Sequence, residues 1–440
     1  MKLQGTMTIN TQGHLCIGGC DTLDLAKEFG TPLYVIDETY LRQNCRDYYQ
    51  AFVQPFPQNK VLYASKAFLT MAMVKIIAQE KLGLDVVSGG ELFTALQAGF
   101  PAEQIYFHGN NKSAVEIEEA LINRVGRIVV DSFRELELVH DLCLKLGTTA
   151  RILLRITPGI DVSTHQHIRT GQIDSKFGLP IITGQALAIV KQALSLETID
   201  LKGLHCHIGS QILEIAPFRN TAAVMMDFLK EIKVETGHEL EELNLGGGMG
   251  IYYASGDEPI AIKEFASPIM ALVQRKAQEL KIEIPKIIIE PGRSIIGPAG
   301  ITLYTIGTVK KVPKIRTYLA VDGGMGDNPR PALYQAKYEA AVANRMLARS
   351  TEIVSIAGKY CESGDLLIKD IKLPEATCGD LLAVSATGAY NYSMASNYNR
   401  LPRPAVVLVN QGKADLIVAR ETYQDLIRHD LIPARLSSPS

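Results

Sequence analysis

The chain has 440 residues, of which 47% are hydrophobic, so it can bury a large core, and its length favours two domains. Lysine and arginine number 45 against 47 aspartates and glutamates, and this net charge of −2 argues against a surface for nucleic acid or for an anionic membrane. Seven cysteines without CxxC pairs indicate neither a disulfide framework nor a metal site. With no apolar signal region or membrane span, we expect a cytoplasmic protein.

The first expected elements are short. Residues 7–17 predict a hairpin with its turn at 11–13. A helix is expected at 23–29, stopped by Gly30, and is followed by a strand at 32–36 and a helix at 40–52. A hairpin alone is unstable, so the N-terminal strands need a partner sheet elsewhere in the chain.

From residue 60 onward, apolar strand candidates alternate with segments of helical period. The eight strand candidates are 60–64, 84–87, 104–108, 127–131, 151–156, 202–208, 242–245 and 286–290. The clearer helices are 68–82, 91–99, 135–146, 185–196, 217–236 and 263–281. Such alternation predicts a parallel sheet, and eight repeats match the roughly 250 residues of a (β/α)8 TIM barrel. The count of eight disfavours the competing fold, a doubly wound open sheet.

After about residue 301 the pattern changes to strands. They are expected at 301–312, 316–321, 366–368 and 381–384, and as a hairpin at 404–408 and 415–419. A helix is expected at 332–346. We therefore predict an α/β barrel domain at 41–299 and a mostly-β domain made of residues 1–40 and 300–440.

Lys66 follows the first barrel strand, where an amine can be desolvated and become nucleophilic enough to form a Schiff base. A lysine after a strand is more often a solvated loop residue. In a TIM barrel, however, chemistry sits at the carboxyl ends of the strands. Polar or glycine-rich groups end most of the predicted strands: Lys66, Ser88, His108, Arg155, His207, Ser210, Gly246 to Gly248, Glu290 and Arg293.

These groups suit a planar, phosphorylated ligand. Gly246, Gly247 and Gly248 can bring backbone N–H groups close to an anion, to which Ser210 and Arg293 could add donors. Glu290 could partner a protonated ring nitrogen or form an ion pair with Arg293, and His207 could stack on a ring or be a core histidine. Together with a Schiff-base lysine, they describe a site for pyridoxal 5′-phosphate (PLP).

At these residues the chain resembles the fold-type III PLP-dependent decarboxylases, and within them the branch that acts on diaminopimelate. The stretches that carry the resemblance are YASKA at 63–67, DVVSGGE at 85–91, GNNKS at 109–113, DSKFG at 174–178, HCHIGSQ at 205–211, GGG at 246–248, EPGR at 290–293, RPALY at 330–334, CESGD at 361–365, GAY at 388–390 and SNYN at 396–399. The family's fold is an alanine-racemase-like barrel with a β-rich domain.

The resemblance implies a role for each matching residue. Lys66 binds PLP covalently, and His207 stacks on its ring. Phosphate binding falls to Ser210, Gly246, Gly247, Gly248, the turn formed by Glu290, Pro291, Gly292 and Arg293, and the hydroxyl of Tyr390. Glu290 pairs with the pyridine nitrogen, and Cys361 reprotonates the α-carbon. Substrate contacts are Arg293, Arg330, Tyr334, Glu362 and Tyr390, and a homodimer shares its active sites across the interface.

The expected reaction is decarboxylation of meso-2,6-diaminoheptanedioate to L-lysine and CO2, the last step of lysine biosynthesis. Arginines suit the substrate's carboxylates, and Glu362 suits its distal ammonium. The alternatives are an ornithine/arginine or carboxynorspermidine decarboxylase, an alanine racemase, and a non-catalytic relative.

Three positions depart from the family's usual pattern. Gly358-Lys359-Tyr360 precedes Cys361 where Gly-Pro is usual, Lys337-Tyr338 replaces an aromatic–histidine pair, and Gly326 stands where asparagine is common. None of these changes removes a catalytic group, but Lys359 and Tyr360 could alter the mobility of the cysteine loop.

Overall fold

The structure is a computed structural model that describes residues 1–160 and 175–437. Asp174, at the start of the DSKFG stretch, lies outside the described residues. The chain divides into two compact units. One combines Met1–Thr39 with Ala299–Ser440, and the other is Tyr40–Pro298.

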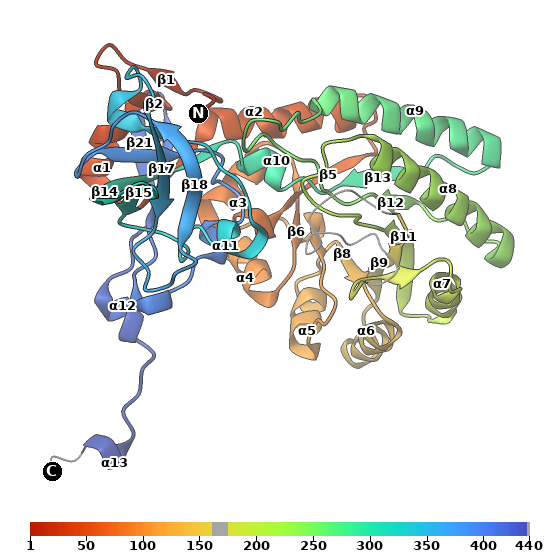
Figure 1. Cartoon of the computed structure of the whole chain (residues 1–440). Coiled ribbons are helices and arrows are strands. Elements are labelled where there is room, and N and C mark those ends of the chain that lie inside the picture. The colour runs from red at the N-terminus through yellow and green to blue at the C-terminus, as the bar shows by residue number, and fades with distance from the viewer. Residues whose placement is uncertain (161–174, 438–440) are drawn as a thin grey trace. The chain divides into compact units, whose positions relative to one another are not determined.

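The Tyr40–Pro298 unit, here called the barrel unit, contains a closed parallel barrel (Figure 1). Its eight strands are β5 (Lys60–Ala64), β6 (Gly83–Val86), β7 (Ile105–Phe107), β8 (Arg127–Val130), β9 (Ala150–Thr157), β11 (Ile199–His205), β12 (Glu242–Asn244) and β13 (Lys286–Ile289). The barrel closes where β13 pairs with β5, with Ile289 opposite Val61. A short strand, β10 (Leu179–Pro180), adds to β9. The predicted eight-stranded barrel is confirmed.

Side chains fill the interior of the barrel. Leu62, Tyr106, Val129, Leu153 and Ile288 form one buried apolar cluster drawn from five strands. Such layers of inward-facing side chains are how TIM barrels pack their centre. The barrel is therefore a solid core, and its chemistry is confined to the loops at the strand ends.

Helices cover the outside of this barrel (Figure 1). They are α3 (Met71–Gln79), α4 (Gly89–Gln97), α5 (Ala114–Ile122), α6 (Phe133–Leu146), α7 (Gln185–Ser195), α8 (Ala216–Thr236), α9 (Ile262–Leu280) and the short α10 (Arg293–Ile296), with α2 (Glu38–Tyr48) before the first strand. Four of them begin at a Ser or Thr N-cap whose side chain accepts a backbone N–H of the first turn: Thr70, Ser88, Ser113 and Ser132. These caps fix the short loops that leave the carboxyl ends of the strands.

The other unit, here called the β-rich unit, is built on one large sheet. Its path is β18 (Leu366–Leu373), β17 (Glu352–Ala357), β15 (Arg316–Val321), β14 (Gly300–Val312), β4 (Leu33–Asp37), β20 (Ala405–Asn410) and β21 (Lys413–Val418). Off this path, β19 (Leu381–Val384) pairs with β14 and with β16 (Ala340–Val342). The N-terminal hairpin, β1 (Thr8–Ile9) and β2 (Leu15–Ile17), continues into β3 (Cys20–Asp21) and α1 (Thr22–Phe29). The predicted mostly-β domain is confirmed, and the N-terminal strand β4 is an interior strand of its sheet.

The prediction of a helix at residues 332–346 is wrong. The α-helix here is only α11 (Arg330–Tyr334), which ends because Gln335 adopts a left-handed φ of 53°, and a single 3-10 turn follows later at Ala343–Arg345. The alanine and valine residues after it form β16, which pairs antiparallel with β19. A further strand, β17, was not predicted. The secondary structure of these segments depends on pairing with strands that are distant in sequence, and local periodicity does not indicate such pairing.

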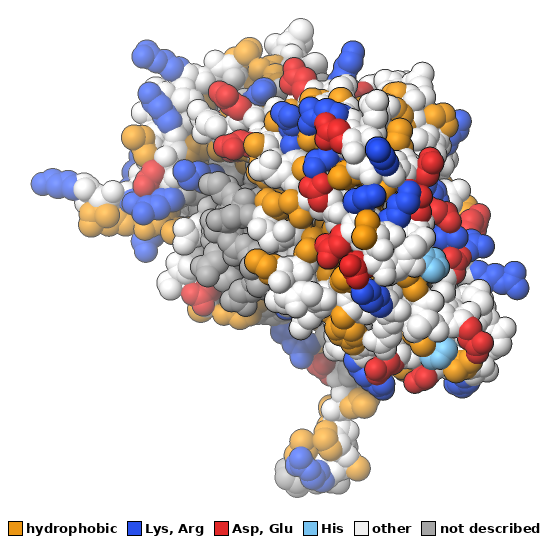
Figure 2. Space-filling view, turned by 90° about the vertical axis from the view of Figure 1, so that its right-hand side faces the viewer, with side chains coloured by type: hydrophobic (Ala, Val, Ile, Leu, Met, Phe, Trp, Pro, Cys, Tyr) orange, Lys and Arg blue, Asp and Glu red, His pale blue; other side chains and the backbone are white. Residues whose placement is uncertain are grey.

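Charges of both signs are interspersed on the face drawn in Figure 2, in keeping with the balanced composition. Among residues 1–160 and 175–437, none of the helices combines the length and the apolar character that a bilayer crossing requires.

Candidate active site at the carboxyl ends of the barrel strands

Lys66 lies in a single turn of 3-10 helix, Ser65–Ala67, directly after β5. Its side chain is 41% exposed, and Nζ lies 3.8 Å from Oδ2 of Asp85, near the end of β6. Burial raises the pKa of Asp85, and the nearby His108 and Lys66 oppose that rise. The amine therefore stands at the barrel rim, open to solvent on one side and facing a buried carboxylate on the other.

Glu290, directly after β13, is buried and held by three side chains from two other strands and one strand-end loop. Asn244 Nδ2 donates to Oε1 at 2.6 Å, and His205 Nε2 lies 3.2 Å from Oε2. His108 Nε2 is 2.8 Å from Oε1. Burial by itself raises the pKa of Glu290, but the two histidines hold that pKa well below its usual range. The carboxylate is thus kept ionised inside the protein.

His205 is neutral in this arrangement. Burial lowers its pKa to about 3, against the opposing effect of Glu290. A neutral imidazole that donates through Nε2 still stabilises the Glu290 carboxylate, because the hydrogen bond favours the charged form of the acceptor.

His207 follows β11 and presents a neutral ring beside the glycine run. Burial, together with the charges of Lys66 and Arg155, holds the pKa of His207 well below its usual range. Its Nδ1 accepts the backbone N–H of Gly247 at 3.3 Å, which fixes that nitrogen as the acceptor. The ring therefore carries no charge that would oppose stacking on a flat heterocycle.

The glycines after β12 are required by close backbone packing. A Cβ on Gly246 would lie 2.5 Å from the carbonyl oxygen of Cys206, and one on Gly247 would lie 2.1 Å from that of Glu290. At Gly248, with φ of +119°, a Cβ would lie 2.4 Å from the carbonyl oxygen of Gly209. Three strand-end loops, after β11, β12 and β13, thus converge at the glycine run.

The predicted anion donors lie together at this convergence. Arg293, at the start of α10, donates through Nε and Nη2 to the hydroxyl of Ser210, at 3.2 and 2.9 Å. Its Nη1 lies 2.5 Å from the hydroxyl of Tyr253. Arg293 is buried, so these hydrogen bonds fix its guanidinium at the rim.

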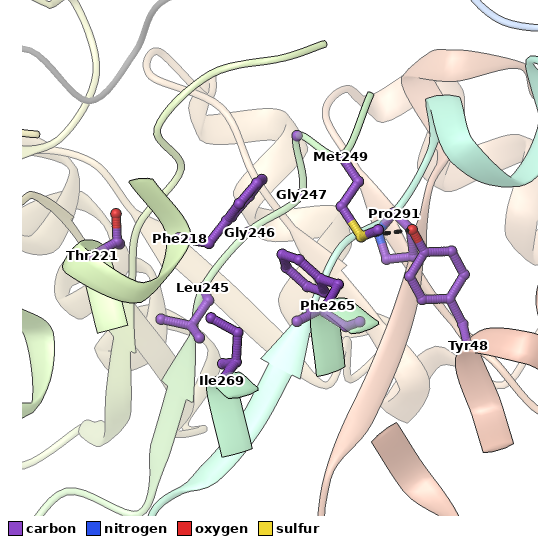
Figure 3. Close-up of a pocket in the computed structure, with 12 residues that line it drawn as sticks. Tyr48, Phe218, Thr221, Leu245, Gly246, Gly247, Met249, Phe265, Ile269 and Pro291 are labelled. Atoms are coloured by element: carbon purple, nitrogen blue, oxygen red, sulfur yellow. Dashed lines mark hydrogen bonds between the residues drawn. The ribbon is translucent and has the colours of Figure 1, made fainter. Parts of the chain in front are cut away.

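A small cavity of about 20 Å³ lies against the glycine run. Phe218, Phe265 and Tyr48 line it with aromatic rings, and the Tyr48 hydroxyl contacts the sulfur of Met249 at 3.2 Å (Figure 3). Because so small a cavity can hold little more than one water molecule, this apolar layer supports the glycine loop and is not a substrate pocket.

The remaining predicted residues belong to the β-rich unit. Arg330, in α11, is buried, and its Nη1 lies 2.5 Å from the hydroxyl of Tyr338. Cys361 and Glu362 are exposed, and Tyr390 adopts a positive φ of 59°. Tyr334 ends α11. That these residues act together with Lys66 stays a prediction.

Comparison with known proteins places the chain in a family. A family model for the pyridoxal binding domain of pyridoxal-dependent decarboxylases matches residues 42–297. The diaminopimelate decarboxylase of Bacillus subtilis (strain 168) is 54% identical over 431 residues, which cover 98% of each chain. The chain belongs to the diaminopimelate decarboxylase family of pyridoxal-dependent decarboxylases. Two crystal structures of a diaminopimelate decarboxylase from M. jannaschii, one of them in complex with L-lysine, each match with a TM-score of 0.92; they are 38% and 39% identical and cover 98% of this chain and 99% of theirs.

The barrel rim fits the cofactor of this decarboxylase family, which is PLP. Ser65 Oγ and both carboxylate oxygens of Asp85 are buried and have no hydrogen-bond partner among the described residues. A polar ligand beside Lys66 would supply such partners. The ionised Glu290 and the neutral ring of His207 are the two charge states that a protonated pyridine requires of its neighbours.

Some residues of this candidate site were given no role from the sequence. Asp85, His108, His205, Asn244 and Tyr253 all contact residues with expected roles. For the first four a signal was present, since each stands within or next to the end of a predicted barrel strand. Tyr253 lies in a loop and gave no such signal.

Proposed function

We propose that this chain decarboxylates meso-2,6-diaminoheptanedioate, giving L-lysine and CO2, with PLP held at Lys66. The observation that carries the proposal is the ionised Glu290, clamped by His108, His205 and Asn244 on the same rim as Lys66. The similarity to the B. subtilis relative over nearly the whole chain supports diaminopimelate as the substrate. An ornithine/arginine or carboxynorspermidine decarboxylase is the less supported alternative.

The barrel unit holds the cofactor. Lys66 Nζ would hold it covalently, His207 would stack on its ring, and Glu290 would partner its pyridine nitrogen. The residues that would bind its phosphate are Ser210, Gly246, Gly247, Gly248, Pro291, Gly292 and Arg293, with the hydroxyl of Tyr390 as a further donor. When bound, PLP supplies an electron sink for the electron pair that the departing carboxylate leaves behind.

The β-rich unit selects the substrate and completes the reaction. Arg330, with Arg293, binds carboxylate, because a guanidinium fork matches two carboxylate oxygens. Glu362 binds the distal ammonium, and Tyr334 and Tyr390 complete the contacts. The Cys361 thiol then delivers its proton to the α-carbon.

The working form is a homodimer in which Cys361 and Glu362 enter the active site of the partner subunit, and the enzyme acts in the cytoplasm. The support within the chain is the exposure of Cys361, Glu362, Ser363 and Gly364, a polar loop that is open to a second copy. A small nucleophilic residue in an exposed polar loop is poorly explained as part of the core.

Purified chain supplied with PLP tests the substrate. We expect CO2 and L-lysine from meso-diaminopimelate, and little CO2 from ornithine, arginine or carboxynorspermidine. Turnover of ornithine without turnover of meso-diaminopimelate would overturn the assignment. Borohydride reduction followed by peptide mass spectrometry should label Lys66, and an unlabelled Lys66 in active enzyme would exclude its role.

A further inference from the structure

Tyr360, the residue before Cys361, packs into the β-rich unit and is only 9% exposed. Its ring stacks on Tyr398, with centroids 5.9 Å apart and planes only 2° from parallel. The backbone N–H of Tyr360 donates to Asp365 Oδ2 at 2.9 Å. The base of the cysteine loop is thus fixed, while the side chain of Cys361 stays exposed.

The residue after Tyr398 holds the next residue of the loop. Asn399 Oδ1 accepts the backbone N–H of Cys361 at 2.8 Å. Asn399 itself adopts a left-handed conformation with φ of 52°, which asparagine tolerates better than most residues. Two consecutive residues, Tyr398 and Asn399, therefore hold two consecutive residues, Tyr360 and Cys361.

Gly326 makes room for the ring of Tyr360. A Cβ at position 326 would lie 2.1 Å from the Tyr360 hydroxyl oxygen and 2.4 Å from Cζ. The asparagine that is common at this position cannot be accommodated while the ring is there. The carbonyl of Gly326 also accepts the backbone N–H of Ser396 at 2.9 Å, which joins this segment to the strip that carries Tyr398. Two departures from the family pattern, at 326 and 360, are therefore one packing arrangement.

We propose that Tyr360, seated on Gly326 and held by Tyr398 and Asn399, is a clamp that fixes the backbone of Cys361, so that Tyr360 and Asn399 are positioning residues for the reaction. The proposal rests on the proposed function, because it takes Cys361 as the proton donor. A thiol that must reach one carbon atom loses turnover when its backbone drifts by even about 1 Å.

Paired variants separate the clamp from general stability. Asn399→Gly keeps the left-handed conformation but removes the acceptor, whereas Asn399→Asp keeps both. Tyr360→Ala removes the stack, whereas Tyr360→Phe keeps it. In Asn399→Gly and Tyr360→Ala, we expect hydrogen exchange at the Cys361 amide to rise about tenfold or more and kcat to fall about tenfold, with PLP absorbance unchanged. In the two matched variants, we expect the exchange rate and kcat to stay near wild type.

Unchanged exchange in both Asn399→Gly and Tyr360→Ala would overturn the clamp, as would an equal change in the matched variants. If Cys361→Ala keeps full turnover, the proposed acid role fails, but exchange at the Cys361 amide still tests the clamp. Gly326→Asn should lower Tm strongly alone and much less in combination with Tyr360→Ala. An equal loss in both backgrounds would show that Gly326 and Tyr360 are not paired.

Discussion

His108 Nε2 lies 2.8 Å from Glu290 Oε1 and 3.9 Å from Asp85 Oδ1, so one imidazole stands between two buried carboxylates. Asp85 in turn faces Lys66. A continuous line of polar groups therefore runs from the lysine to the carboxylate proposed for the pyridine nitrogen. The charge of one end depends on the groups at the other, because the surroundings are buried and weakly screened.

Replacing His108 with Gln should weaken the cofactor site. The change removes an imidazole that favours the ionised Glu290, an interaction worth about 1–3 kcal/mol for a charged group. We expect PLP affinity, followed by visible absorbance, and kcat to fall about 10- to 100-fold. The matched control is His140→Gln, because His140 contacts Thr198 Oγ1 on the outer helix layer. A His108 variant that behaves like the His140 variant would contradict the role of this contact.

Gly247→Ala should disrupt the glycine run. The new Cβ would lie 2.1 Å from the carbonyl oxygen of Glu290, so the loop after β12 must move away from the loop after β13. Such overpacking costs about 1–3 kcal/mol, and we expect PLP binding to be lost before the fold is. Gly307→Ala, whose Cβ would meet its nearest neighbour at 3.9 Å, is the control and should keep both Tm and PLP.

Glu242, in β12, should stabilise the barrel at the end opposite the active site. Its carboxylate accepts from Arg127 at 2.7 and 2.9 Å and from Lys286 at 2.9 Å. Glu242→Gln leaves these cations without their counter-charge, and we expect about 3 kcal/mol lower unfolding free energy in urea at pH 7, with little change in the intact enzyme's KM. Glu235→Gln, in an exposed pair with Lys191, should change stability little.

The effect of Glu242 should depend on pH. Burial raises the pKa of Glu242, but hydrogen bonds and charges from Arg127 and Lys286 leave it below its usual value. Because the folded-state pKa is depressed, the stabilisation is complete above the ordinary glutamate pKa of about 4.3 and disappears as pH falls through the lower folded value. The difference between wild type and Glu242→Gln should therefore shrink in acid, and a constant difference would contradict this cause.

Mixing Lys66→Ala and Cys361→Ala chains tests the shared site. If Cys361 serves the partner's Lys66, about half of randomly mixed dimers are hybrids, each with one intact site, so activity should return to about a quarter of wild type. The chains should be mixed after partial denaturation and refolding, with each variant refolded alone as the control. Activity no higher than in the separate variants would place both residues in the same subunit's site.

The barrel could be predicted because most of its eight strands are distinct apolar runs that are each followed by a polar or glycine-rich loop. Lys66, His207, Gly246 and Glu290 were selected as candidate site residues for that reason. The partners of Glu290 were harder to predict, since His108 and His205 belong to separate strands and come together only when the barrel closes. The segment at 332–346 was mispredicted because β16 depends on β19, which is distant in sequence.

Strand β4 lies between β14, its antiparallel neighbour, and β20, its parallel neighbour. At its end, the backbone N–H of Asp37 donates to the carbonyl of Ala299 at 2.8 Å, so the chain leaves the sheet and returns to it at one point. The barrel is thus an insertion in a β domain. If the barrel were removed, a short loop could join residue 37 to residue 299. During synthesis on the ribosome, β4 emerges before the whole barrel, and its neighbours β14 and β20 emerge after it. The β-rich unit is therefore completed last.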